Sequence, residues 1–80
     1  MILGKLAIGF HPTIEYPDGN NKKLSPGMRI KYNNMKGRLW SLNVGTSHGH
    51  GYSQPIYKVF FVNYNAEIKI LKHGDSFEIL

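Results

Sequence analysis

Residues 46–55, TSHGHGYSQP, hold the side chains best suited to chemistry in this chain. His48 and His50 stand two residues apart, so in an extended backbone both imidazoles project from the same side and offer two corners of a metal site. A stable zinc or copper site needs one or two further ligands, and the other histidines, His11 and His73, sit at predicted turns. The intervening glycines also raise the entropy cost of ordering a site. We therefore expect neither a metal nor a cofactor.

The same stretch lacks the groups that catalysis needs. Ser47 precedes His48, but no carboxylate occurs between Asp18 and Glu67 to orient the imidazole. The glycines are not followed by the Lys-Ser/Thr of a phosphate-binding loop. We therefore predict that the protein is not an enzyme. Residues 45–55 are interpreted as a glycine-rich connection between two strands, either pliant or used for recognition. Its length favours a binding loop that contains His48 and His50.

Positive charge is concentrated in the middle of the chain. The net charge is +5, from ten Lys and Arg against five Asp and Glu. The acid-free interval holds seven cations: Lys22, Lys23, Arg29, Lys31, Lys36, Arg38 and Lys58. Such a field attracts polyanions and speeds their association. The alternative is a solubilising surface in which the sheet folds the terminal acids over the basic strands.

Length and composition predict one domain, residues 1–80, in the cytoplasm. Eighty residues leave no room for a second core. The chain has no cysteine, so neither disulfides nor a thiolate zinc site can stabilise that core, and this suits a reducing compartment. The start, MILGKLAIGF, lacks the features of a secretory signal, and no segment approaches the roughly 18 apolar residues that span a bilayer. We expect no membrane partner.

Apolar and polar residues alternate along most of the chain, which predicts strands. Residues 56–64 are apolar on both faces, so the sequence does not decide which face of this strand meets the core. Elsewhere the alternation directs Arg29 and Lys31 towards water and a second set towards the core: Leu6, Ile8, Phe10, Met28, Ile30, Tyr32, Trp40, Leu42, Val44, Phe77 and Ile79.

The strands predict an all-β fold. No window of ten or more residues keeps a helical period, so we expect at most one short 3₁₀ or α turn. Short strands with turn residues every eight to twelve positions indicate a small antiparallel barrel or sandwich of five to seven strands. Closure, or near closure, would remove the exposed edges that make such strands prone to associate.

From residue 24 onward the order of features resembles a small Src-homology-type β-barrel of the KOW/Tudor kind. LSPGMRIKY is similar to the opening turn and first strand, MKGRLWSL to the next turn glycine and strand, IYKVFFVNYNAEIKIL to a strand pair, and HGDSFEIL to the closing strand. The resemblance implies a barrel core over residues 24–80 with residues 1–23 as an N-terminal β extension. Members of that group bind RNA, DNA or protein segments, and the likeness implies that Lys36 and Arg38 flank a nucleic-acid-facing loop at Gly37.

Two functions remain from this reasoning. The first is a basic β-barrel that binds RNA or single-stranded DNA with little sequence specificity. Its expected contacts are phosphate contacts by six cations and stacking by two rings: Lys22, Lys23, Arg29, Lys31, Lys36, Arg38, Tyr52 and Tyr57. The second is a protein-interaction module, such as a phage or mobile-element inhibitor or adaptor that docks on an acidic partner. There Phe60, Val62 and Tyr64 would form an exposed strand for docking or for a homodimer.

Overall fold

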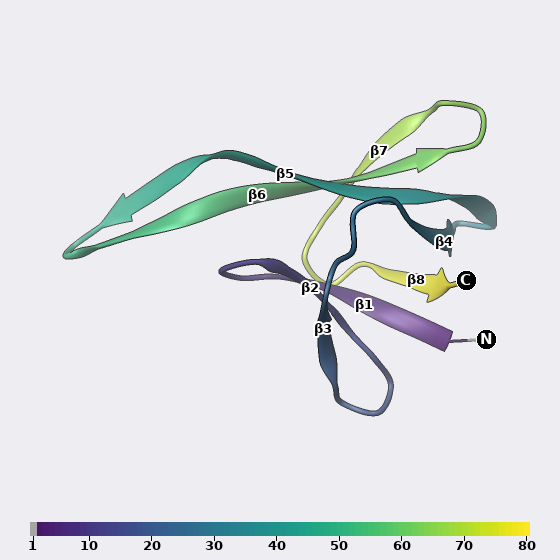
Figure 1. The fold of residues 1–80 in the computed structure, drawn as a ribbon, viewed down its shortest axis with the longest axis horizontal. Coiled ribbons are helices and arrows are strands. Elements are labelled where there is room, and N and C mark those ends of the chain that lie inside the picture. Colours follow the sequence, from purple (N-terminus) through teal and green to yellow (C-terminus); the bar gives the residue numbers. More distant parts are fainter. Residues whose placement is uncertain (1) are drawn as a thin grey trace.

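A computed structural model describes residues 2–80, which form eight strands and no helix (Figure 1). The strands, in chain order, are β1 (Ile2–Ile8), β2 (Pro12–Glu15), β3 (Asn21–Lys23), β4 (Met28–Tyr32), β5 (Met35–Gly49), β6 (Tyr52–Asn63), β7 (Ile68–Leu71) and β8 (Ser76–Ile79). The all-β class predicted from the alternation is therefore confirmed. Among the described residues no helix is long and apolar enough to cross a membrane.

All eight strands belong to one antiparallel sheet with the order β3-β2-β1-β8-β4-β5-β6-β7. The sheet is not closed, because β3 and β7 are its two edges. It folds over instead, so that β1, β2 and β3 lie on one side and β5, β6 and β7 on the other (Figure 1). The segment expected as an N-terminal extension is part of this sheet, since β1 pairs with β8.

One core fills the space inside the folded sheet. Both halves contribute to it, and its members are Leu6, Ile14, Leu24, Ile30, Leu39, Val59, Phe61, Leu71 and Phe77. Met28, Tyr32 and Ile79 pack against this core, as their alternation predicted. On β6 the core side is the one that carries Val59 and Phe61. Phe10, expected inside, is 61% exposed beyond the end of β1.

The predicted orientation of β5 is wrong by one residue. Trp40, Leu42 and Val44 are 45%, 56% and 46% exposed, whereas Leu39 is fully buried. The core-facing position before Leu39 is Gly37, where an added Cβ would lie 2.3 Å from the Val62 carbonyl oxygen and 2.7 Å from the Phe61 ring. The glycine is needed because the backbone of β6 at Val62 and the Phe61 ring occupy the space that a side chain would fill. Without a side chain at that position, the apolar pattern alone favoured the opposite face.

Residues 45–55 are not a loop, contrary to the prediction. β5 runs to Gly49, β6 begins at Tyr52, and only His50 and Gly51 form the turn between them. Gly51 has a φ of 77°, which glycine adopts without strain. A β-bulge between Asn43 and Gly45 interrupts the ladder, and there the Asn43 Oδ1 accepts a hydrogen bond from the Gly45 N–H at 3.0 Å.

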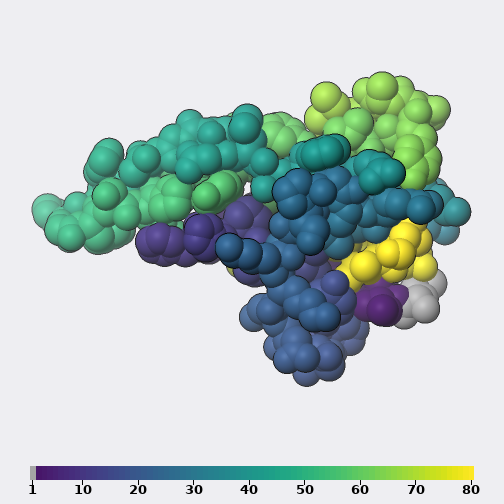
Figure 2. Space-filling model, viewed as in Figure 1, coloured from purple at the N-terminus to yellow at the C-terminus, as the bar shows by residue number. Residues whose placement is uncertain are grey.

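We call residues 42–57 of this β5–β6 hairpin the arm. The arm extends beyond the rest of the molecule and gives it an elongated outline (Figure 2). The Cα positions span 42 × 31 × 17 Å. Because β4 pairs with β5 only as far as Leu39, and β7 with β6 only as far as Val59, the arm is a two-stranded ribbon with neither edge paired.

Candidate nucleic-acid interface

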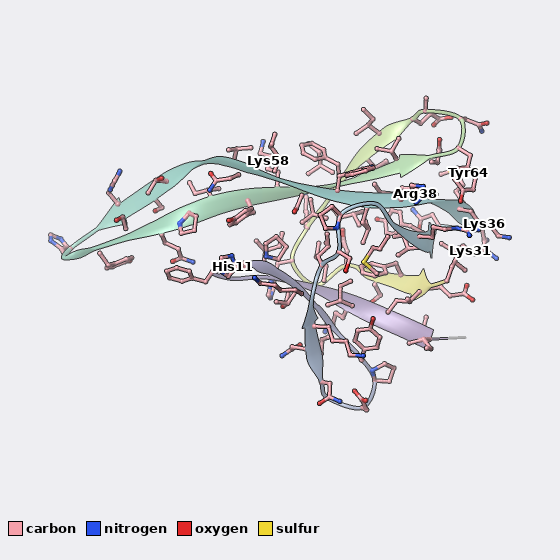
Figure 3. The ribbon with its side chains drawn as sticks, in the orientation of Figure 1. His11, Lys31, Lys36, Arg38, Lys58 and Tyr64 are labelled. Atoms are coloured by element: carbon pink, nitrogen blue, oxygen red, sulfur yellow. The ribbon has the colours of Figure 1, made fainter. Side chains whose placement is uncertain are left out.

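Four of the predicted cations meet on the face of the sheet that points away from the core, which we call the outer face. Arg29 and Lys31 come from β4, and Lys36 and Arg38 from β5. The strand register places Arg29 opposite Arg38 and Lys31 opposite Lys36. These four residues are named the basic cluster. Figure 3 shows Lys31, Lys36 and Arg38 at the same end of the molecule.

The arrangement of the basic cluster is costly for the free protein. Like charges placed directly opposite one another on neighbouring strands destabilise a sheet. The one acid among the register partners of the cluster within the described strands is Glu78 on β8, which faces Lys31. The charge is therefore largely left for a ligand or for solvent to neutralise.

Arg38 is held in a defined position within the cluster. Its Nη1 donates a hydrogen bond to the Gly27 carbonyl oxygen at 2.8 Å. Gly27 lies in the connection that leads into β4, and its own N–H donates to the Leu39 carbonyl at 2.7 Å. This anchoring removes part of the rotamer entropy that a long side chain would lose on binding an anion.

Next to the basic cluster on the outer face lie Trp40 and Phe60, which we call the aromatic pair. They are direct cross-strand neighbours on β5 and β6. Trp40 is 45% exposed and rests on Gly27, where an added Cβ would come within 3.1 Å of the indole ring. Phe60 is half-buried. A ring that is supported from below and open above can stack on another planar group.

Cations lie on both sides of the aromatic pair along the strands. Arg38 is two residues before Trp40, and Lys58 is two residues before Phe60, opposite Leu42. Residues separated by two positions on a strand share a face, so all of these side chains belong to the outer face. Tyr64, which is 60% exposed, lies just after β6 near the cluster (Figure 3).

The other predicted contact residues lie elsewhere. Lys22 and Lys23 are on the edge strand β3, separated from β4 in the sheet by β2, β1 and β8. Lys22 Nζ lies 4.8 Å from the centre of the Tyr16 ring. Tyr52 is exposed, as predicted, but belongs to the arm, and Tyr57 is half-buried beside His11 with ring centres 5.9 Å apart. The structure thus brings together four of the six cations and neither tyrosine.

The histidine stretch forms the end of the arm. His48 is the second-last residue of β5, and His50 is the first residue of the turn. Both are exposed. Within residues 2–80 no group of three or more His, Cys, Asp or Glu side chains is placed to hold a metal ion. A cavity of about 190 Å³ near the base of the arm is lined by His11, Lys23 and Tyr57 among others.

Trp40 and Lys58 were not predicted as site residues, and Phe60 was expected only in a strand for docking or for a homodimer. A signal for them exists in the spacing of the charges. Trp40 has the same parity as Arg38, and Phe60 the same parity as Lys58, so a strand that directs its cations to water also directs these rings outward. On β5 and β6 the positions of the charged residues identify the exposed face, whereas the positions of the apolar residues do not.

Comparison with known proteins finds no significant match among protein families, curated proteins or solved structures.

Proposed function

We propose that this protein binds single-stranded nucleic acid, RNA or DNA, on its outer face and with little sequence specificity. The proposal rests on the order in which side chains follow one another along the outer face: the basic cluster, then the aromatic pair, then Lys58. Phosphates contact the cations while a base stacks on Trp40, the common solution for binding unpaired strands. Residues 24–80 resemble barrels of the KOW/Tudor kind, which bind RNA, DNA or protein segments, so the resemblance is compatible with this proposal without choosing the ligand. In the cytoplasm such a face would bind RNA or single-stranded DNA.

Single strands suit this face better than duplexes do. In a duplex the bases are stacked on one another, so an exposed indole on a broad sheet has no base plane to contact. In an unpaired strand every base offers such a plane, and this makes the contact tolerant of sequence. A bound polyanion also relieves the repulsion within the basic cluster, so part of the binding free energy comes from removing an unfavourable feature of the free protein.

Paired charge-removal variants test this assignment. The double variant R29S/K31S removes two cations of the basic cluster, and K22S/K23S removes two from β3, so both variants carry the same net charge. We expect the first to weaken binding of a labelled oligouridylate about tenfold or more and the second to weaken it by less than about threefold. Fluorescence anisotropy at fixed salt measures both. Equal losses in the two variants would contradict a localised site.

A second candidate function is supported by the apolar residues that continue these rows onto β7. Ile68 lies opposite Val62, and Ile70 lies opposite Phe60. Ile68 and Ile70 are 65% and 55% exposed. Their aliphatic side chains can neither pair with phosphates nor offer a ring on which a base stacks. They suit the docking of an acidic partner protein, as in a phage or mobile-element inhibitor or adaptor. A partner that is retained after nuclease treatment and lost in the I68S/I70S variant would favour this function.

A further inference from the structure

The two edges of the arm differ in how they are protected from pairing with another strand. An isolated two-stranded ribbon is marginally stable in water, and its unpaired edges are templates for further pairing. The arm has two such edges: β5 beyond Leu39 and β6 before Val59. The residues on each edge therefore decide whether the arm pairs with a further strand.

The turn at the end of the arm fixes which backbone groups reach each edge. A two-residue turn makes the flanking residues, Gly49 and Tyr52, a hydrogen-bonded pair. Alternate residues along both strands therefore direct their backbone groups outward. On β5 the outward residues next to the turn are Thr46 and His48, and on β6 they are Ser53 and Pro55.

The β6 edge is protected. Pro55 occupies an outward position, where its missing N–H costs the β5–β6 ladder nothing and leaves no donor for an incoming strand. Towards the base of the arm, the Tyr57 ring lies against His11 and Lys58 adds a charge. The β5 edge has no such feature at Thr46 to Gly49, and its outward N–H and C=O groups are free to pair.

Because the arm carries no charged residue, the arm of a second copy of the chain is the strand that we expect to pair with it. No Lys, Arg, Asp or Glu occurs in residues 42–57, although the whole chain carries a net charge of +5. Arg38 is nine residues from Ser47, so an axis at Ser47 leaves each basic cluster roughly 30 Å away and the two clusters roughly 60 Å apart. At physiological salt, repulsion is screened beyond about 8 Å. Two copies can therefore meet here without opposing charges.

We propose that the β5 edge of the arm pairs with the same edge of a second copy in an antiparallel, two-fold arrangement. In the register that places Thr46 opposite His48 of the second copy, and His48 opposite Thr46 of the second copy, all four outward residues exchange backbone hydrogen bonds. The two Ser47 residues then face each other across the axis as a non-hydrogen-bonded pair. The result is a four-stranded sheet of two arms.

This pairing is independent of the proposed nucleic-acid function. An added strand extends the sheet in its own plane, so the aromatic pair and the basic cluster keep their exposure. The dimer then presents two equivalent outer faces at its opposite ends.

Proline substitution at matched positions tests the proposal. H48P removes an outward N–H from the β5 edge, and S53P removes one from the β6 edge directly across the ladder. Sedimentation equilibrium should show a concentration-dependent dimer for the native chain and for S53P. The dissociation constant should rise about tenfold or more in H48P, because symmetry removes two hydrogen bonds at once. A native chain that is monomeric at high micromolar concentration, or an equal effect of the two variants, would overturn the proposal.

Disulfide trapping gives a second readout that does not depend on proline. The chain has no cysteine, so S47C introduces a single thiol at the proposed axis, where Cα atoms of the two copies come to about 4.5 Å. The control is Q54C, at the cross-strand neighbour of Ser47 on the same face. Under mild oxidation S47C should form covalent dimer at least tenfold faster than Q54C. Equal rates would show random collision and would overturn the β5–β5 assignment.

Discussion

At the scale of single residues, the outer face places like charges next to one another. Arg29 faces Arg38, and Lys31 faces Lys36. A cross-strand pair of this kind contributes unfavourably, on the order of 0.5 kcal/mol. A chain under no other constraint would be more stable with an opposite or neutral residue at one of these positions, so the basic cluster is the place where stability and binding are expected to conflict.

The substitution K36E should therefore stabilise the free protein and weaken its binding. Lys31 already faces Glu78 on β8 and would then face an opposite charge on its β5 side as well, in place of a like charge, which predicts a gain of about 0.5–1 kcal/mol in the free energy of unfolding. Oligonucleotide affinity should fall about tenfold or more. Urea unfolding and anisotropy measure the two effects. The control K22E changes a cation on β3 that faces Ile14. A K36E variant that is less stable and binds the oligonucleotide with unchanged affinity would contradict the expected conflict between stability and binding.

At the scale of elements, the arm depends on one glycine and tolerates another. Gly51 has a φ of 77°, a conformation in which a side chain is strained, whereas Gly45 has open space where a Cβ would be added. We expect G51A to destabilise the arm by about 1 kcal/mol and G45A to leave it unchanged or slightly stabilised. Hydrogen exchange of the arm amides reports this directly. Equal protection in both variants would contradict the turn at His50 and Gly51.

Much of the fold follows from the sequence at this scale. Period-two alternation predicts the strands, and Ile30 and Phe77 are buried as that alternation requires. The arm was missed because glycine-rich segments usually form loops, whereas a projecting ribbon has room for glycine at positions that face solvent. The orientation of β5 was missed because the Val62 carbonyl and the Phe61 ring fill the space at Gly37, a contact between residues far apart in sequence that no local pattern contains.

The candidate site was also predictable in part from the alternation of residues along the strands. Alternation of charge on β4 places Arg29 and Lys31 on one face, and a short turn at Asn33 and Asn34 brings Lys36 opposite Lys31. Both asparagines have positive φ, which suits a two-residue hairpin turn. The separation of Lys22 and Lys23 from this group follows instead from the strand order, which depends on long-range pairing of β1 with β8.

At the scale of the whole molecule, the two proposed functions belong to two separate surfaces, the outer face and the arm. The outer face gathers cations, the exposed Trp40 and the half-buried Phe60 over β4, β5 and β6, and the arm is a charge-free ribbon that extends away from them. Two faces joined through their arms would bind one long strand at two points, which raises the effective affinity without any new contact. Disruption of the arm edge should then weaken binding to long strands more than binding to short ones.

The most direct test of the central claim is the fluorescence of Trp40, the sole tryptophan of the chain, during titration with oligouridylate at several salt concentrations. Stacking of a base on the indole predicts strong quenching by the single strand and little by a duplex of equal length. Contacts from the five outer-face cations predict a slope of roughly −3.5 for the logarithm of affinity against that of salt. Binding that leaves the fluorescence unchanged, or an affinity that does not depend on salt, would contradict the account.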